Sequence, residues 1–136
     1  MSEGPASLPW IQLALADQES ISLRSQVNVA ARRVDVLVGG GLRAAVQPEE
    51  KRDEIAFHAA LRFDEDASEE QRRALLERLA DGHGIDYAIV NRDWLAARRR
   101  LPFGAVGTAE ELVERFQQFL NDALGRLEEA DEEDLL

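Results

Sequence analysis

The residues with the most recognisable chemical spacing are the consecutive glycines 39–41, which follow the apolar run Val34–Val38. From Gly39 to Ala44 the pattern is G-x-G-x-x-A. In a dinucleotide-binding fold such glycines let the backbone approach a pyrophosphate at a helix N-terminus. Here Pro48 would end such a helix soon after it began, and the chain is too short for the further strand–helix units of that fold. The pattern therefore favours a hairpin with glycines at its tip, and nucleotide binding stays a remote alternative.

Other catalytic arrangements are not indicated. The chain has no cysteine, no serine lies in a G-x-S-x-G motif, and neither histidine has acids at metal-ligand spacing. His58 is predicted on the polar face of a strand, and His83 at a helix terminus, where its charge suits the helix dipole. The acidic cluster 64–66 precedes a helix, where negative charge is also favourable. We therefore expect a non-enzymatic protein without catalytic residues, metal or cofactor.

The concentrated positive feature is the arginine run 98–100. On a strand, Arg98 and Arg100 share one face with Trp94. Such a face suits an acidic peptide or the chain's own acidic tail, whereas an exposed strand edge guarded by arginine explains the same residues without a partner.

Aromatic residues accompany these arginines. Tyr87 and Trp94 belong to the same predicted hairpin, and Trp, Tyr and Arg are the types enriched among anchors for protein partners. Burial under a helix explains both aromatics equally well. The sequence leaves open whether Trp94, and likewise Trp10, belongs to the core or to an interface.

Composition and charge limit the function classes. The 136 residues, of which 45% are hydrophobic, suit one domain with its own core. The net charge of −11 disfavours nucleic acid and anionic membranes as partners. No apolar run reaches the roughly 20 residues of a membrane helix, and no signal peptide is recognisable. The absence of cysteine fits a reducing compartment, and we expect a cytoplasmic protein.

Alternation of apolar and polar residues predicts about five strands, and capping motifs predict three helices. A triple glycine, a Pro-containing charged loop at 47–53 and an Asn-Arg-Asp turn at 91–93 separate the strands. Whether residues 27–38 form one bent strand or two is left open. The alternation runs over 20–29 and continues over 34–38, and it recurs at 42–46, 54–63, 85–90 and 94–101. The helices are predicted as a short one capped by Ser7, one from the capping box Ser68–Gln71 to Gly82, and one from Thr108 to Leu127.

These elements predict an α+β fold in the order α-β-β-β-α-β-β-α, with helices packed on one face of an antiparallel sheet. Residues 1–9 are expected to be a flexible arm, 10–127 a single domain and 128–136 an acidic tail. Because the tail shows no core-facing pattern, we expect it to stay in solvent and its residues 131–136 to be dispensable for folding.

From Val34 to Leu127 the chain resembles the class I type III secretion chaperones and the related bacterial sensory-transduction-regulator-like proteins. The likeness rests on the pattern of elements. It is carried by the strand 55–63, Leu75-Leu76 in the middle helix, the hairpin 85–102 and the closing helix 108–127. Two features depart from the family: the first helix is short, and Gly82-His83-Gly84 stands where the family has an asparagine-bearing segment.

The resemblance implies a homodimeric, non-enzymatic protein that holds an extended segment of a client protein along apolar patches of its sheet and helices. The alternative is a small regulatory or ligand-binding domain of a larger assembly. The residues expected to contact the partner are Tyr87, Trp94, Arg98, Arg100, Phe116 and Leu120.

Overall fold

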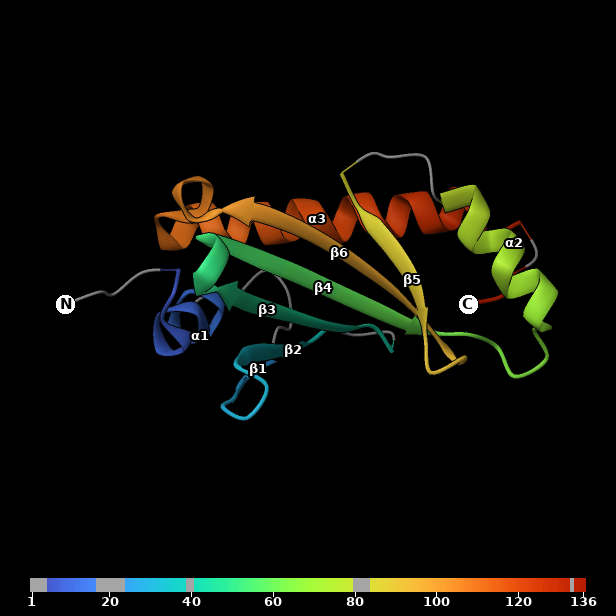
Figure 1. Ribbon diagram of the computed structural model, residues 1–136, viewed down its shortest axis with the longest axis horizontal. Helices are drawn as coiled ribbons and strands as arrows, with labels where there is room; N and C mark the ends of the chain where they lie inside the picture. The colour runs from blue at the N-terminus through green and yellow to red at the C-terminus, as the bar shows by residue number, and fades with distance from the viewer. Residues whose placement is uncertain (1–4, 17–23, 39–40, 80–83, 133) are drawn as a thin grey trace.

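The computed structural model describes residues 5–16, 24–38, 41–79, 84–132 and 134–136, which form a six-stranded antiparallel sheet with three α-helices (Figure 1). The strand order is β1-β2-β3-β4-β6-β5. In chain order the elements are α1 (Leu8–Ala16), β1 (Arg24–Asn28), β2 (Arg33–Leu37), β3 (Arg43–Glu49), β4 (Glu54–Arg62), α2 (Glu69–Leu79), β5 (Asp86–Val90), β6 (Trp94–Pro102) and α3 (Ala109–Ala130). The predicted α+β class is confirmed.

The sheet has more strands than the predicted order allowed, because the segment 27–38 is a hairpin of two strands. The Asn28 side chain accepts a hydrogen bond from the Ala31 amide at 3.1 Å, and Arg32 at φ +54° completes the turn. Asparagine is suited to this role because its short side chain bonds to its own local backbone.

The β2–β3 hairpin forms as predicted, with Val36 opposite Ala44 and Gly41 at φ +79°. The tip glycines 39 and 40 lie outside the described residues. A strand, not a helix, follows Gly41, so the backbone geometry of a dinucleotide site does not occur here. The loop predicted at 47–53 is shorter than expected, because β3 continues through Pro48 to Glu49. Pairing with β2 ends at Val46, so Pro48 removes no bond from that side.

The core lies between one face of the sheet and the helices α1 and α3. Phe57 of β4 stacks against Phe116 and Phe119 of α3, with ring centroids 5.4 and 5.9 Å apart. Ile11 and Leu15 bring α1 onto the same cluster, as Ser7 caps the helix with its hydroxyl 3.4 Å from the Trp10 amide. This packing supplies most of the apolar burial that stabilises the fold.

The capping box of α2 forms as the sequence predicts. The Ser68 amide donates to the Gln71 side chain at 2.9 Å, and the Gln71 amide donates to the Ser68 hydroxyl at 3.1 Å. Arg72 fastens this helix to the sheet, since its guanidinium donates to the carbonyl oxygens of Asp64 and Arg92 and lies over the ring of Phe63. The predicted helix end at residues 80–83, including His83, lies outside the described residues.

The expectation that the acidic tail stays in solvent is wrong for its end. Helix α3, capped by the Thr108 hydroxyl, runs beyond Leu127 to Ala130. The Asp131 carboxylate then accepts the amides of Leu135 and Leu136 at 2.8 and 3.1 Å. Leu135 is only 4% exposed, packs in a second apolar cluster with Leu75 and Leu79, and accepts the Asp64 amide. Two apolar residues after a run of acids were too short a pattern to predict this contact.

Candidate partner-binding surface

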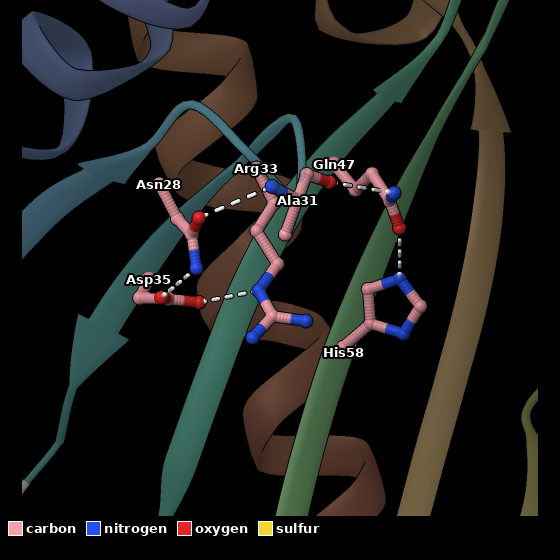
Figure 2. A network of polar contacts seen from close by, with 6 residues as sticks. All are labelled: Asn28, Ala31, Arg33, Asp35, Gln47 and His58. Atoms are coloured by element: carbon pink, nitrogen blue, oxygen red, sulfur yellow. Dashed lines mark hydrogen bonds and ion pairs between the residues drawn. The ribbon is translucent and has the colours of Figure 1, made fainter.

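The sheet has one face that no described helix covers. Along β4, Ile55, Phe57 and Ala59 point into the core, so Ala56, His58 and Ala60 point to the opposite side. Figure 2 is seen from that side, with the strands in front and α3 behind them. A sheet that leaves one face open to solvent ordinarily carries polar side chains there. This face carries both polar and apolar ones.

A shallow hollow of about 630 Å³ lies on the open face. Its floor consists of small side chains on three neighbouring strands, Ala45, Ala60 and Ala96, and we call it the alanine hollow. Its apolar rim includes Leu37, which is 60% exposed, and Val90, which is 42% exposed. Exposed apolar side chains grouped around a concavity are typical of a site that binds another molecule.

Two arginines without an acidic partner are neighbours of Trp94: Arg43 lines the hollow, and Arg62 lies beside it on β4. The guanidinium of Arg43 lies 4.8 Å from the centre of the Trp94 ring, which is cation–π geometry. Arg62 is the cross-strand neighbour of Trp94, and Leu37 that of Arg43. Within the described part of the chain, no carboxylate forms an ion pair with Arg43 or Arg62. This end of the hollow therefore combines an indole ring, aliphatic side chains and unpaired positive charge.

The other end of the open face carries a connected polar network (Figure 2). Gln47 donates its amide to the Ala31 carbonyl at 3.3 Å, which fixes its oxygen toward the His58 ring, 3.1 Å from Nε2. Because an amide oxygen only accepts, His58 Nε2 carries the hydrogen. Asp35 accepts from Arg33 at 2.7 Å. The network ties the β1–β2 turn to β3 and β4, and it holds the imidazole in one orientation.

His58 is held in its neutral form. Burial lowers its pKa from the ordinary value of 6.5, and the positive charges of Arg98 and Arg33 lower the pKa further. Glu49 raises it and Arg100 lowers it to smaller extents. With Nε2 protonated, Nδ1 of the neutral ring is an acceptor.

Three of the expected partner-contacting residues do lie together on the open face. Trp94 is half-buried beside the hollow, which answers the question of core or open surface for this residue. Arg98 approaches Asp86 at 3.6 Å, and Arg100 donates to Glu49 at 3.1 Å. Both arginines are thus engaged within the chain, although Nε of Arg98 is buried without a hydrogen-bond partner.

The other three expected residues lie elsewhere. Tyr87 projects to the helix side, where its hydroxyl donates to the Ala123 carbonyl of α3 at 3.3 Å. Burial raises the pKa of this phenol. Phe116 and Leu120 are buried between α3 and the sheet, at 0% and 5% exposure. The structure therefore does not bring these three residues together with Trp94. Trp10, also left open by the sequence, packs partly buried against the main core.

Sequence reasoning missed the residues that give the open face its character. The missed residues are Leu37, Arg43, Ala45, Ala60, Arg62 and Val90. The signal was present in part: the alternation that assigned Leu42, Ala44 and Val46 to the core placed Arg43, Ala45 and Gln47 on the other face. What the sequence lacked was the strand order, which sets β4 between β3 and β6 and so assembles the floor.

Among the described residues, no group of three or more His, Cys, Asp or Glu side chains is placed to hold a metal ion. The same residues include no helix that is long and apolar enough to cross a membrane.

Comparison with known proteins supports the fold. No family model matches the sequence, and no curated protein matches it. Among solved structures, the chain is similar to YbjN from E. coli, described as a proposed transcription regulator, with a TM-score of 0.66 and 16% identity over 99% of this chain and 98% of that one. It is also similar to a chain of the HopA1–SchA chaperone–effector complex, with a TM-score of 0.54 and 13% identity over 89% and 90%.

Both neighbours agree with the families that the sequence resembles, so the resemblance is confirmed at the level of the fold. At such identities the likeness concerns the fold alone, and function has to be argued from this chain's own surface.

Proposed function

We propose that this protein is a non-enzymatic, chaperone-like module that binds an extended segment of a partner protein on the open face of its sheet. The observation that carries the proposal is the alanine hollow, where Leu37, Val90 and Trp94 surround a floor of small side chains that no described element covers. A partner's apolar side chains would lie on this floor, and the net charge of −11 would keep the complex in solution.

The likeness to a chain of a chaperone–effector complex supports a protein partner over a small metabolite. The shape of the site supports it too, because a shallow hollow on a sheet surrounds a small ligand less completely than an enclosed pocket does. The absence of cysteine supports the cytoplasm as the place of action.

We further propose a homodimer, as the resemblance implies. Outside the hollow, Leu13 on α1 is 70% exposed and Val29 after β1 is 76% exposed. Burial of such side chains by a second copy would remove apolar surface from water. Native mass spectrometry should show a dimer that the variant Leu13→Glu weakens. A wild-type monomer at micromolar concentration would exclude this part of the proposal.

The binding experiment starts from the protein purified from its own cells, with native mass spectrometry to identify any polypeptide that it retains. The identified segment is then titrated onto wild-type protein, Ala96→Glu and the control Ala74→Glu. Ala96 lies on the hollow floor, whereas Ala74 is exposed on α2. We expect Ala96→Glu to weaken binding at least about tenfold, because the longer side chain would occupy the floor on which the partner's apolar side chain lies, and Ala74→Glu to leave it unchanged.

Circular dichroism of each variant shows whether it folds, and Trp94→Ala provides a second test of the same surface. Equal affinities for wild-type protein, Ala96→Glu and Trp94→Ala would show that the partner binds elsewhere. The complete lack of a retained or reconstituted protein partner would refute the function.

A further inference from the structure

Resting on the proposed function, we infer that the partner segment recognised at the Trp94 end of the hollow is acidic: an extended peptide with a carboxylate two residues away from a large apolar side chain. The inference names the chemistry of the partner, which the fold and its neighbours leave open.

The argument begins with the distribution of charge. The chain carries 27 acidic and 16 basic residues, yet its open sheet face is rich in arginine. Most of these arginines are already neutralised there: Arg33 pairs with Asp35, Arg98 with Asp86 and Arg100 with Glu49. Among the side chains that the structure describes on the three strands β3, β4 and β6, Arg43 and Arg62 form no ion pair, and both are adjacent to Trp94.

The register places these two arginines close enough to act on one ligand. Arg43 pairs with Ala60, two residues from Arg62 along β4. Diagonal neighbours of this kind have their Cα atoms roughly 7–8 Å apart. A guanidinium binds a carboxylate through two parallel hydrogen bonds, and the Trp94 ring already holds that of Arg43 in place. Less conformational entropy is then lost when a carboxylate arrives.

The apolar part of the site specifies the rest of the ligand. Leu37 lies directly across from Arg43, and Val90 directly across from Trp94. Successive side chains of an extended segment point to opposite sides, so a segment that places a carboxylate on the arginines would set the apolar side chain two residues along on the floor at Ala60 and Ala96. An acidic and an apolar residue two positions apart therefore satisfy both halves of the site at once.

A nucleic acid fits this surface less well, although arginine and tryptophan also bind bases and phosphates. Each further phosphate of the strand would approach Asp35, Asp86 or Glu49 on the same face, and the whole chain repels a polyanion. A short acidic peptide needs only the two free cations.

The test uses three fluorescently labelled peptides of about seven residues, in which Glu and Leu occupy every second position in turn and Ser stands between them. The other two peptides carry Gln or Lys in place of Glu, and the three are called Glu-Leu, Gln-Leu and Lys-Leu. We expect fluorescence anisotropy to show the tightest binding for Glu-Leu. Arg43→Gln and Arg62→Gln should each weaken that binding by up to about fivefold, the upper end of the range for an exposed charge pair. The control Arg115→Gln, at an exposed site on α3, should leave it unchanged.

Several results would overturn the inference. One is equal affinity for the three peptides, or Glu-Leu binding that is indifferent to both arginine variants. Another is tighter binding of a single-stranded oligonucleotide with the same arginine dependence. A third is a dimer that dissociates in Ala96→Glu, since a second copy would then fill the hollow.

The inference and the proposed function fail separately. If a natural partner binds wild-type protein and loses affinity with Ala96→Glu but not with the double variant Arg43→Gln/Arg62→Gln, the function stands and acid recognition falls. If the affinity of the Glu-Leu peptide depends on both arginines while the affinity of the natural partner is unchanged by Ala96→Glu, the inferred recognition of acidic peptides is supported and the proposed function is refuted.

Discussion

At the scale of single residues, the alternating direction of side chains along a strand determines which residues lie on the open face and which lie in the core. Trp94 and Leu95 are consecutive on β6, yet Trp94 is half-buried beside the hollow and Leu95 is 1% exposed in the second apolar cluster. We therefore expect Leu95 to matter for stability and Trp94 to matter for binding.

We expect Leu95→Ala to lower the free energy of unfolding by about 3 kcal/mol, because it leaves a cavity in a packed cluster. Trp94→Ala should cost about 1 kcal/mol, mainly the contact with Arg43 and part of the ring's burial. Urea denaturation of both variants measures the difference. A larger loss for Trp94→Ala than for Leu95→Ala would mean that the indole is a core residue.

His58 gives a pH-dependent expectation. Its pKa is lowered in the folded protein, by burial first and by Arg98 and Arg33 next, so the unfolded chain takes up the proton at higher pH. The stabilising contribution is therefore complete above 6.5 and is lost as pH falls from 6.5 toward the folded pKa. We expect wild-type stability to fall more than that of His58→Gln between about pH 7.5 and about pH 5.5.

The measurement is urea denaturation of both proteins at each pH, where the shared titration of carboxylates cancels in the difference. An NMR titration of the His58 ring supplies a direct check, and Arg98→Gln should move its pKa back up. Arg62→Gln serves as the control, since Arg62 is not among the charges that shift His58. A midpoint above 6.5 would contradict the assignment.

At the scale of elements, the acidic tail is part of the structure. Leu135 lies in the cluster formed by α2, β6, the end of α3 and Phe63 just after β4, and the Asp131 carboxylate holds the turn that leads to it. We expect Leu135→Ala to lower the free energy of unfolding by about 2 kcal/mol. Leu136→Ala, at a half-buried neighbour, should cost clearly less. Thermal denaturation of the two variants checks this, and equal melting temperatures for wild type and Leu135→Ala would show that the contact does not stabilise the fold.

Elements with a local signal were predictable from the sequence, and contacts between distant elements were not. The alternation on β4 and the motifs at Ser68 and Thr108 depend on neighbouring residues, and all three appear as expected. The docking of Leu135 on α2 and the meeting of Arg43 with Trp94 join segments far apart in the chain. No pattern within either segment contains that information.

The candidate site was predictable to the same extent. Trp94, Arg98 and Arg100 were placed on one strand face because period-two alternation is local. That Phe116 and Leu120 belong to the core was not decidable from the helix alone, since an apolar stripe fits a partner and a sheet equally well.

At the scale of the whole molecule, the net charge of −11 opposes folding through self-repulsion. Salt screens this repulsion, and the ion pairs that salt also weakens are at least partly exposed, so each contributes little. We expect the melting temperature to rise by a few degrees between about 10 mM and about 500 mM NaCl. Binding of the Glu-Leu peptide should weaken over the same range, because it depends on attraction. A melting temperature that falls with NaCl would show that attractive ion pairs dominate stability.

The alanine floor also bears on how the chain can change over evolutionary time. Alanine is a poor residue for strands, where valine or threonine would strengthen the sheet, and yet Ala60 and Ala96 occupy adjacent central strands on a face that the core does not need. Selection for folding alone would tend to replace them with larger residues. If the hollow is used, they persist because each larger side chain would fill the space. Conservation of small residues at these two positions among related sequences would then indicate selection for binding rather than selection for stability.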